Sequence, residues 1–410
     1  MAQSDVEAAR WLRKASEQGD ALAQYNLGWL FERGHGVAQS HLEALRWYKK
    51  AADQGHDCAQ AHLGILFRDG CGVGQSDVQA AQWFRKAADQ GNTDAQYCLG
   101  FMYKEGCGVV QSDMRAARWY KKAAEQGHSD AQHTLGGMFK DGRGVVQSDV
   151  EAARWYRKAA DQENPNAQSS LGVLFMVGRG VVQSDVEAAQ WFRKAADRGD
   201  PSAQINLGGL FLEGRGVAQN DAEAALWCRK AVDQGNPDAQ HNLGGFYMAD
   251  RGVAQSDVEA VSWCRKAADQ GNPDAQHNLG GFYMAGRGVA QSDAEAALWY
   301  RKAADRGHAG AQCNLGVFFD AGCGVAQSCV EAEKWLRKAA DQGHPEAHHN
   351  SRVMSERVQS PGQNDEAGSR RLIHQAPRAE GTLAHSAQLS LIHEIRNRFL
   401  LLILPLGYKL

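Results

Sequence analysis

The sequence predicts an all-α fold, an α-solenoid superhelix of about nine 36-residue helix-turn-helix repeats. Two observations lead to this prediction. Tryptophan recurs every 36 residues from Trp11 to Trp335, and Ala-Gln pairs keep the same interval from Ala23 to Ala311 without an insertion. A fixed period of this length is the signature of repeat architectures, in which each unit is one supersecondary element that stacks on its neighbours.

The first half of each repeat predicts a helix. In the seventh repeat, Asn236 supplies an N-cap side chain and Pro237 the proline that the first helical position favours. Ala239, Leu243 and Tyr247 then recur at helical spacing and predict one packing stripe. In most repeats a glycine follows, as a left-handed C-terminal cap prefers.

The second half of each repeat predicts another helix. It opens with a capping box such as the one from Ser148 to Glu151, in which the serine caps the helix and the glutamate lies three residues later. Ala152, Trp155 and Tyr156 mark its buried stripe. Each repeat is therefore expected to be a helical hairpin, with a short glycine-rich turn inside it.

The period also sets the predicted boundaries along the chain. Residues 1–19 form an N-terminal half repeat with the second helix only, residues 20–343 hold nine complete repeats, and residues 344–359 are a degenerate tenth. Residues 360–380 have the composition of a linker. Residues 381–410 are amphipathic, and we expect a capping helix there because terminal repeats need a cover for their apolar face. A membrane-surface segment and a misread gene end are the alternatives.

Charge and composition argue against several classes of partner. The chain has 45 basic and 48 acidic residues, so its net charge of −3 gives no reason to expect nucleic acid. Arg157 and Lys158 are followed by Asp161 within pairing distance on a helix, which predicts a self-neutralised surface. No apolar stretch approaches the roughly 20 residues of a transmembrane helix. The N-terminus lacks the basic and apolar regions of a signal peptide, and we expect a cytoplasmic protein.

The cysteines fit the same location. There are nine of them, at scattered positions in the repeat, and an odd number cannot all pair within one chain. Reduced thiols are typical of the cytosol.

No residue set predicts catalysis, a cofactor or a small-molecule substrate. The serines of the Gln-Ser-Asp steps are explained as helix caps, and the motifs of hydrolases and phosphate-binding loops are missing from the sequence. His133, His241 and His277 share one position in successive repeats. Helices pack about 8–10 Å apart, whereas Zn–N bonds are about 2.1 Å long, so we expect an exposed histidine ladder and no metal.

The repeat resembles the Sel-one-like repeat family, relatives of the tetratricopeptide repeats. The resemblance rests on the Leu243-Gly244 core followed by Tyr247 and on the Gly252-Val253 turn, and it covers about residues 1–350. It implies a non-catalytic adaptor or scaffold, because family members assemble protein complexes in endoplasmic-reticulum degradation, cell-wall regulation and bacterial signalling.

Two alternatives follow from the same resemblance. One is a hydrolase acting on a cell-wall or β-lactam substrate. The other is a lumenal adaptor of endoplasmic-reticulum-associated degradation whose signal peptide is missing. Secreted relatives carry a regular cysteine pair in each repeat; here no repeat has such a pair, which removes the grounds for secretion or for penicillin binding.

The resemblance also implies a binding surface for a protein or peptide. In tetratricopeptide relatives, first-helix positions two and five residues on either side of the core leucine face a concave groove. Trp and Tyr are enriched among interface hot spots, so we expect an aromatic patch there, in which lysines select an acidic ligand group and histidines continue the row. The predicted binding residues are Tyr25, Trp29, Tyr97, Phe101, Lys104, Lys140, His241 and His277. Alternatively, Trp29 packs beneath the N-terminal half repeat.

Overall fold

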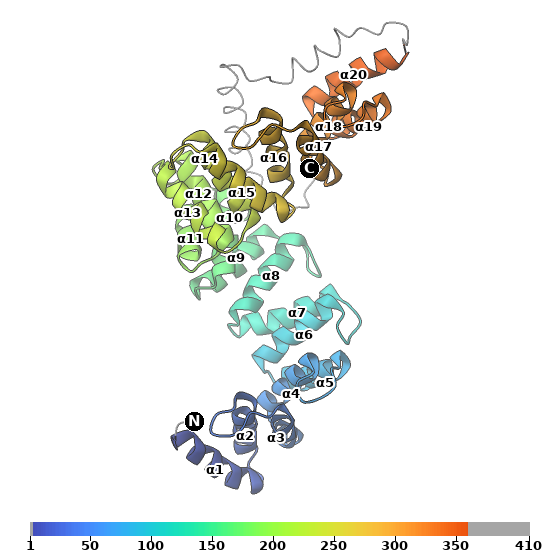
Figure 1. Ribbon diagram of the computed structural model, residues 1–410. Coiled ribbons are helices and arrows are strands. Elements are labelled where there is room, and N and C mark those ends of the chain that lie inside the picture. The colour runs from blue at the N-terminus through green and yellow to red at the C-terminus, as the bar shows by residue number, and fades with distance from the viewer. Residues whose placement is uncertain (1–2, 360–410) are drawn as a thin grey trace. The chain divides into compact units, whose positions relative to one another are not determined.

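The computed structural model describes residues 3–359, and within them the chain forms twenty helices and no strand (Figure 1). The predicted all-α solenoid of helical hairpins is confirmed. The expected linker and capping segment, residues 360–410, lie outside the described residues. No described helix has both the length and the apolar character needed to cross a membrane.

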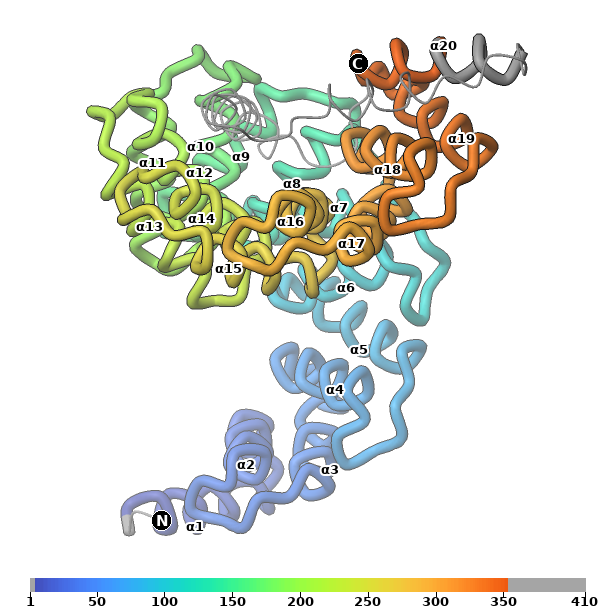
Figure 2. Tube along the Cα trace, turned by 45° about the horizontal axis from the view of Figure 1, so that its top comes forward, coloured from blue at the N-terminus to red at the C-terminus, as the bar shows by residue number. Residues whose placement is uncertain are grey.

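Two kinds of helix alternate along the chain, and the trace reverses direction at the turn between them (Figure 2). The first helices of the repeats are α2 (Ala21–Arg33), α4 (Asp57–Asp69), α6 (Thr93–Glu105), α8 (Ser129–Asp141), α10 (Pro165–Val177), α12 (Pro201–Glu213), α14 (Pro237–Ala249), α16 (Pro273–Ala285), α18 (Ala309–Ala321) and α20 (Pro345–Gln359). The second helices are α1 (Gln3–Glu17), α3 (His41–Asp53), α5 (Asp77–Asp89), α7 (Asp113–Glu125), α9 (Asp149–Asp161), α11 (Asp185–Asp197), α13 (Asp221–Asp233), α15 (Asp257–Asp269), α17 (Asp293–Asp305) and α19 (Cys329–Asp341).

The helices separate into two compact units. Unit 1 ends at Ser184 and contains α1 to α10, and unit 2 begins at Asp185 and contains α11 to α20. Within each unit, consecutive helices pack against one another, first within a hairpin and then from one hairpin to the next.

The helix ends follow the predicted caps, with one difference. Ser148 Oγ accepts a hydrogen bond from the backbone N–H of Glu151, and Gly142 ends α8 in the left-handed conformation at φ 68°. Asp250 adopts the same conformation at φ 53°, where most repeats have glycine. The second half of the predicted capping box is not formed, because the backbone N–H of Ser148 donates to the carbonyl of Phe139, in the first helix of the same hairpin.

Most hairpins are closed by an aromatic ring of the second helix that packs against a glycine of the first helix. The glycine of the Leu-Gly core faces a ring from the second helix, and a Cβ added to Gly100 or Gly136 would lie only 2.9 or 2.7 Å from ring atoms of Tyr120 or Tyr156. Real Cβ atoms do not approach ring carbons so closely. The two helices can therefore reach this separation only because the glycine has no side chain.

A buried glutamine connects each repeat to the preceding one. Gln132, of the Ala-Gln pair, is 4 % exposed, and its Nε2 donates to the carbonyl of Ala124 in the preceding repeat at 3.0 Å. Its Oε1 accepts from Gln162 Nε2 at 2.8 Å. Both interactions recur at Gln24, Gln60, Gln96, Gln204 and Gln312. Gln240 Oε1 likewise accepts a hydrogen bond from Gln270 Nε2, at 2.9 Å.

Arginines in the interhelical turns form a second link between repeats. Arg143 pairs with Asp113 of the preceding repeat through two nitrogens, Nε at 3.3 Å and Nη2 at 3.2 Å. Arg179, Arg215, Arg251 and Arg287 pair in the same way with Asp149, Asp185, Asp221 and Asp257. A guanidinium that binds a carboxylate through two nitrogens fixes orientation as well as distance.

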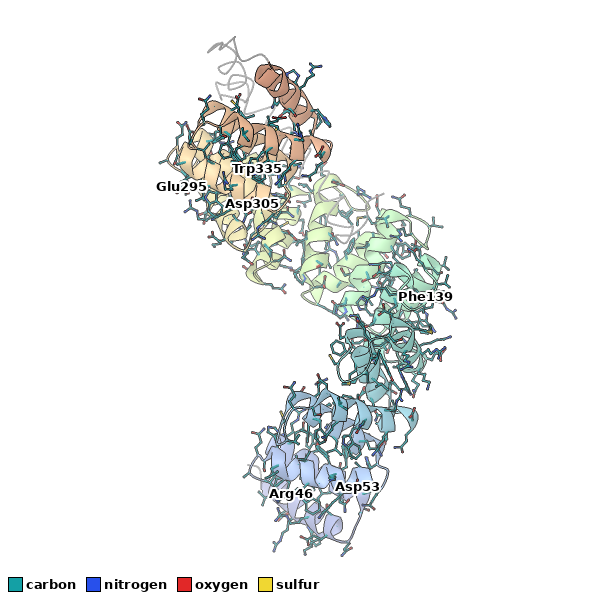
Figure 3. All side chains as sticks on the ribbon, turned by 90° about the vertical axis from the view of Figure 1, so that its right-hand side faces the viewer. Arg46, Asp53, Phe139, Glu295, Asp305 and Trp335 are labelled. Carbon is teal, nitrogen blue, oxygen red and sulfur yellow. The ribbon has the colours of Figure 1, made fainter. Side chains whose placement is uncertain are left out.

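The predicted pairing of Arg157 and Lys158 with Asp161 is wrong. No ion pair of the described residues joins them; Lys158 Nζ lies 4.3 Å from the centroid of Trp155, and Arg157 Cζ lies 5.4 Å from that of Phe175. Both distances suit cation–π interactions. The same lysine–tryptophan contact recurs at Trp335, a 4 % exposed ring of α19 that Figure 3 labels.

The neighbouring glycines of α8 give a test of hairpin closure. Gly136→Ala forces a Cβ against the Tyr156 ring, and we expect a local destabilisation of about 1–3 kcal/mol from overpacking. Gly137→Ala is the control: its Cβ would lie 3.5 Å from the Tyr156 hydroxyl, and the better helix propensity of alanine should keep or raise stability by up to about 1 kcal/mol. Amide hydrogen exchange in α8 and α9 measures both, and equal effects would contradict the closure by the ring.

Arg306 interrupts the glutamine link and predicts a stabilising substitution. It stands where most repeats have glutamine, and Gln276 Oε1 is buried without a hydrogen-bond partner among the described residues. Arg306→Gln should donate to Gln276 as Gln342 does to Gln312 at 2.7 Å, and raise stability by about 0.5–1.5 kcal/mol. Urea unfolding measures the change, and the variant Gln342→Arg should lower stability. An Arg306→Gln variant that unfolds earlier than the wild type would refute this account.

Candidate functional site

The four predicted aromatic residues lie on two first helices of unit 1. Trp29 and Phe101 remain exposed at 39 % and 43 %, while Tyr25 and Tyr97 are half-buried. Tyr25 packs with the core around Tyr48, and Tyr97 with the core that contains Tyr120. The structure therefore gives two aromatic places, one on α2 and one on α6, with α4 between them in sequence, and no described contact joins them into one patch.

Trp29 packs on the turn of its own repeat. Its ring stacks on His35 with centroids 5.4 Å apart and planes 7° from parallel, and Arg33 Cζ lies 6.0 Å from its centroid. The imidazole holds the indole in one orientation, yet more than a third of the side chain still meets solvent. A large apolar ring that is both oriented and accessible is suited to bind a partner at low entropic cost.

Tyr25 and Tyr97 join neighbouring repeats. Tyr97 stacks on His128 of the next repeat at 4.6 Å, and Tyr25 stacks on His56 at 4.8 Å. Tyr25 Oη also lies 3.3 Å from His62 Nε2. These two rings are therefore part of the packing between repeats, and each leaves only part of its surface for a ligand.

Each of the predicted ligand-selecting lysines has an acidic neighbour. Lys104 Nζ lies 2.9 Å from Glu105 Oε1, and Lys140 Nζ lies 3.5 Å from Asp141 Oδ1. An acidic ligand would have to compete with these carboxylates for the ammonium groups.

The histidines of the predicted ladder pack between repeats. His241 is only 8 % exposed, so the expectation of an exposed histidine is wrong there. His277 is half-buried, stacks on His308 at 4.6 Å, and its Nε2 lies 3.1 Å from Asn314 Nδ2. His133 Nε2 lies 3.2 Å from Ser170 Oγ in the next repeat, and burial lowers its pKa.

A second set of histidines, not predicted from the sequence, caps the first helices. His308 Nδ1 accepts from the backbone N–H of Ala311 at 2.9 Å, and its Nε2 lies 3.2 Å from Asp274 of the preceding repeat. In another repeat, Asn272 does the same with its amide, accepting from Ala275 and donating to an aspartate of the preceding repeat. The signal in the sequence was a His, Asn or Asp three residues before each Ala-Gln pair.

The first two repeats also contain a polar network that sequence reasoning missed. Tyr48 Oη donates to Glu32 Oε2 at 2.5 Å, and His62 Nδ1 lies 3.3 Å from the same oxygen. His62 Nε2 in turn faces Tyr25 Oη. The adjacent imidazole of His62 lowers the pKa of Glu32, although burial opposes this shift. The signal was an acidic Glu32 at a position where the next repeat has Arg68.

A hydroxyl, an imidazole and a carboxylate in sequence are the parts of a nucleophile activated by a base. Burial, followed by the charges of Cys58 and Glu32, raises the pKa of Tyr25. A phenol with a raised pKa is a poor nucleophile at neutral pH, because little of it is ionised. The network therefore favours a structural role, in which Tyr25 and His62 hold the Glu32 side chain in place.

One group of potential metal ligands lies at the start of α4. Ligand atoms of His56, Asp57 and Cys58 lie within 4.8 Å of one another. However, His56 Nδ1 accepts from the backbone N–H of Ala59, and Asp57 Oδ2 accepts from Asn92 Nδ2 at 3.0 Å. The positive end of the helix dipole also disfavours a cation here. The geometry therefore favours helix capping at this position. All nine cysteines are free thiols.

Successive helical hairpins of constant length, closed by a glycine and linked by buried glutamines, define a helical-repeat protein of the solenoid class. The chain belongs to the Sel1 repeat family. The Sel1 repeat model matches ten segments, residues 1–20, 21–56, 59–92, 93–128, 129–164, 165–200, 201–236, 237–272, 273–308 and 309–344.

Two solved structures are similar over most of this chain. The crystal structure of a protective antigen of uropathogenic Escherichia coli, which displays an SLR fold, is 31 % identical, with 98 % of this chain and 91 % of that chain covered and a TM-score of 0.58. A Sel1 repeat protein from Oxalobacter formigenes is 32 % identical, with 74 % and 89 % covered and a TM-score of 0.61. No curated protein matches this chain.

The lowered pKa of Glu32 predicts a pH dependence of stability. Because its pKa lies below the ordinary 4.5, the ionised form is favoured by folding, and this contribution is present above pH 4.5 and lost as the pH falls through the folded pKa. Glu32→Gln removes it, so the difference in unfolding free energy between wild type and variant should shrink below pH 4.5. Urea unfolding at pH 7 and pH 3 measures this difference, with the exposed Glu17→Gln as control. A difference that grows on acidification to pH 3 would contradict the assignment.

Proposed function

We propose that this protein is a non-catalytic adaptor that binds a peptide segment of a partner protein along the first helices of unit 1. The carrying observation is the exposure of Trp29 and Phe101, two large rings that the repeat does not require at these positions. Sel1 repeat proteins are typically protein-interaction scaffolds, which supports this class of function.

Trp29 and Phe101 occupy equivalent positions in their repeats, and other repeats have no ring there. At the same first-helix position, the fourth and the eighth repeats have Gly137 and Gly281, so hairpin packing does not demand an aromatic ring. Exposed tryptophan and phenylalanine lose hydration favourably on binding and have few rotamers to freeze. The rest of both helices is anchored by buried leucine and glycine, so a ligand would meet a preformed surface.

We also propose that the protein is cytoplasmic. Its partner is another protein, not nucleic acid or a small molecule. Nine free thiols suit a reducing compartment, and the paired basic side chains on the first helices leave little positive charge for phosphate groups.

The test uses peptides selected from a random library on the immobilised full-length protein. Replacing both Trp29 and Phe101 with Ala should weaken the binding of the selected peptides by 2 kcal/mol or more, roughly 30-fold in Kd, because aromatic hot-spot residues contribute binding energies of this size. Isothermal titration calorimetry measures the affinity, and circular dichroism should show unchanged helicity.

A matched control is the pair Val146→Ala and Val182→Ala. These valines are exposed at 87 % in the interhelical turns, away from the first helices, and their loss should not change peptide affinity. If the aromatic double variant binds as the wild type does, or if the valine variants bind as weakly as it does, the assignment of this surface is wrong.

A further inference from the structure

The first repeat carries a carboxylate and two rings on one face of one helix. Tyr25, Trp29 and Glu32 occur at positions i, i+4 and i+7 of α2, which places them on the same side of the helix. The Glu32 side chain is 20 % exposed, so it is neither fully buried in the core nor freely solvated.

Glu32 keeps one oxygen for a ligand. Tyr48 and His62 both contact Oε2, and no described residue donates a hydrogen bond to Oε1. The imidazole of His62, 3.3 Å from Oε2, also favours the ionised carboxyl group, whose pKa is lowered. Oε2 is thus held in place by the protein. The negative charge of Glu32 is only partly compensated, because the Tyr48 hydroxyl and the His62 imidazole can both be neutral donors.

The rings beside this carboxylate can accept a cation. A cation within about 6 Å of an indole or phenol centroid is attracted by the ring, more strongly where water is partly removed. Trp29 offers its exposed part, and Arg33 Cζ already lies 6.0 Å from its centroid. Tyr25 lies against His56 and Tyr48, so its ring is fixed before any ligand arrives.

The charge at this position changes sign between the first repeat and the three that follow it. In the next repeats it is occupied by Arg68, Lys104 and Lys140, and each of these cations contacts the acid directly after it in sequence. In the first repeat the acid is at the position itself and is followed by Arg33, and no described ion pair joins Glu32 to Arg33. The first repeat therefore differs in chemistry as well as in shape from its neighbours.

We propose that Glu32, together with Tyr25 and Trp29, binds the ammonium group of a lysine side chain in the partner peptide. The ammonium group donates a hydrogen bond to Glu32 Oε1, and the methylene chain of the lysine packs on Trp29. This proposal rests on the proposed peptide-binding function and names the residue type that the first repeat selects.

The experiment uses n-butylammonium chloride, which has the charge and the methylene chain of lysine, with the full-length protein labelled with ¹⁵N at its tryptophans. The indole N–H signal of Trp29 is identified by its loss in Trp29→Phe. We expect this signal to shift with n-butylammonium and to reach saturation, and to shift at most weakly with n-butanol or sodium butyrate. Equal shifts with n-butanol would overturn the proposal, because apolar contact alone would then explain binding.

Two variants test the role of the charge. Glu32→Gln keeps an acceptor for Tyr48 and should weaken n-butylammonium binding at least fivefold, while amide hydrogen exchange in α2 shows whether the helix is retained. Arg33→Ala removes an exposed neighbouring cation and should bind n-butylammonium at least as tightly as the wild type. Unchanged binding by a folded Glu32→Gln, or weaker binding by Arg33→Ala, would overturn the lysine site.

The outcome separates the lysine site from the adaptor function. If n-butylammonium does not bind but selected peptides still depend on Trp29 and Phe101, the adaptor function stands and the lysine site is wrong. If selected peptides bind independently of Trp29 and Phe101, the adaptor surface is wrong whatever the amine does. If the lysine site is correct, the selected peptides should share a lysine, and replacing it by norleucine should weaken binding to the wild type and leave binding to Glu32→Gln unchanged.

Discussion

The contact between a glycine of the first helix and a ring of the second helix determines the geometry on which the rest of this structure depends. With no Cβ on the glycine, the two helices approach until the ring fills the space between them, and rings such as Tyr120 and Phe84 are almost completely buried there. Close-packed interiors tolerate little change in volume, so this contact fixes the separation of the helices in a hairpin. In two repeats the ring is replaced by cysteine and in a third by Leu336, and Cys264 Sγ then occupies the place of the ring beside its glycine.

The links between repeats use the separation that this contact sets. The amide of Gln132 bonds to Ala124 of the preceding second helix and to Gln162 at the end of the following one. It can reach both only if the first helix keeps a fixed distance from each of these second helices. Buried amides are costly when they lack partners, so each repeat is held in register with the next by a hydrogen-bond requirement as well as by apolar packing. Arg143 and Asp113 add a link at the outer ends of the hairpins.

The hairpins could be predicted from the sequence because their signals are local. Caps, packing stripes and the 36-residue period depend on residues close together in the chain, and Ser148 and Gly142 cap helices as predicted. Most side-chain contacts between repeats could not be predicted, since they join residues 30 to 37 positions apart and several side chains compete for each. Lys158 shows the limit even within a helix: Trp155 and Asp161 were both within its reach, and only the structure shows that it lies over the ring. For the candidate site, the resemblance predicted a face of the first helices but not the histidines of the next repeat that cover Tyr25 and Tyr97.

The uniform contacts between repeats have a consequence for the length of the array. Residues 236–249 and 272–285 are identical, so the coding sequences there can align out of register by one repeat. Recombination between them would add or remove 36 residues, and the new junction would again place a glutamine opposite a glutamine and an arginine opposite an aspartate. The number of repeats between the first repeat and the C-terminal end can therefore change during evolution without any new contact being invented.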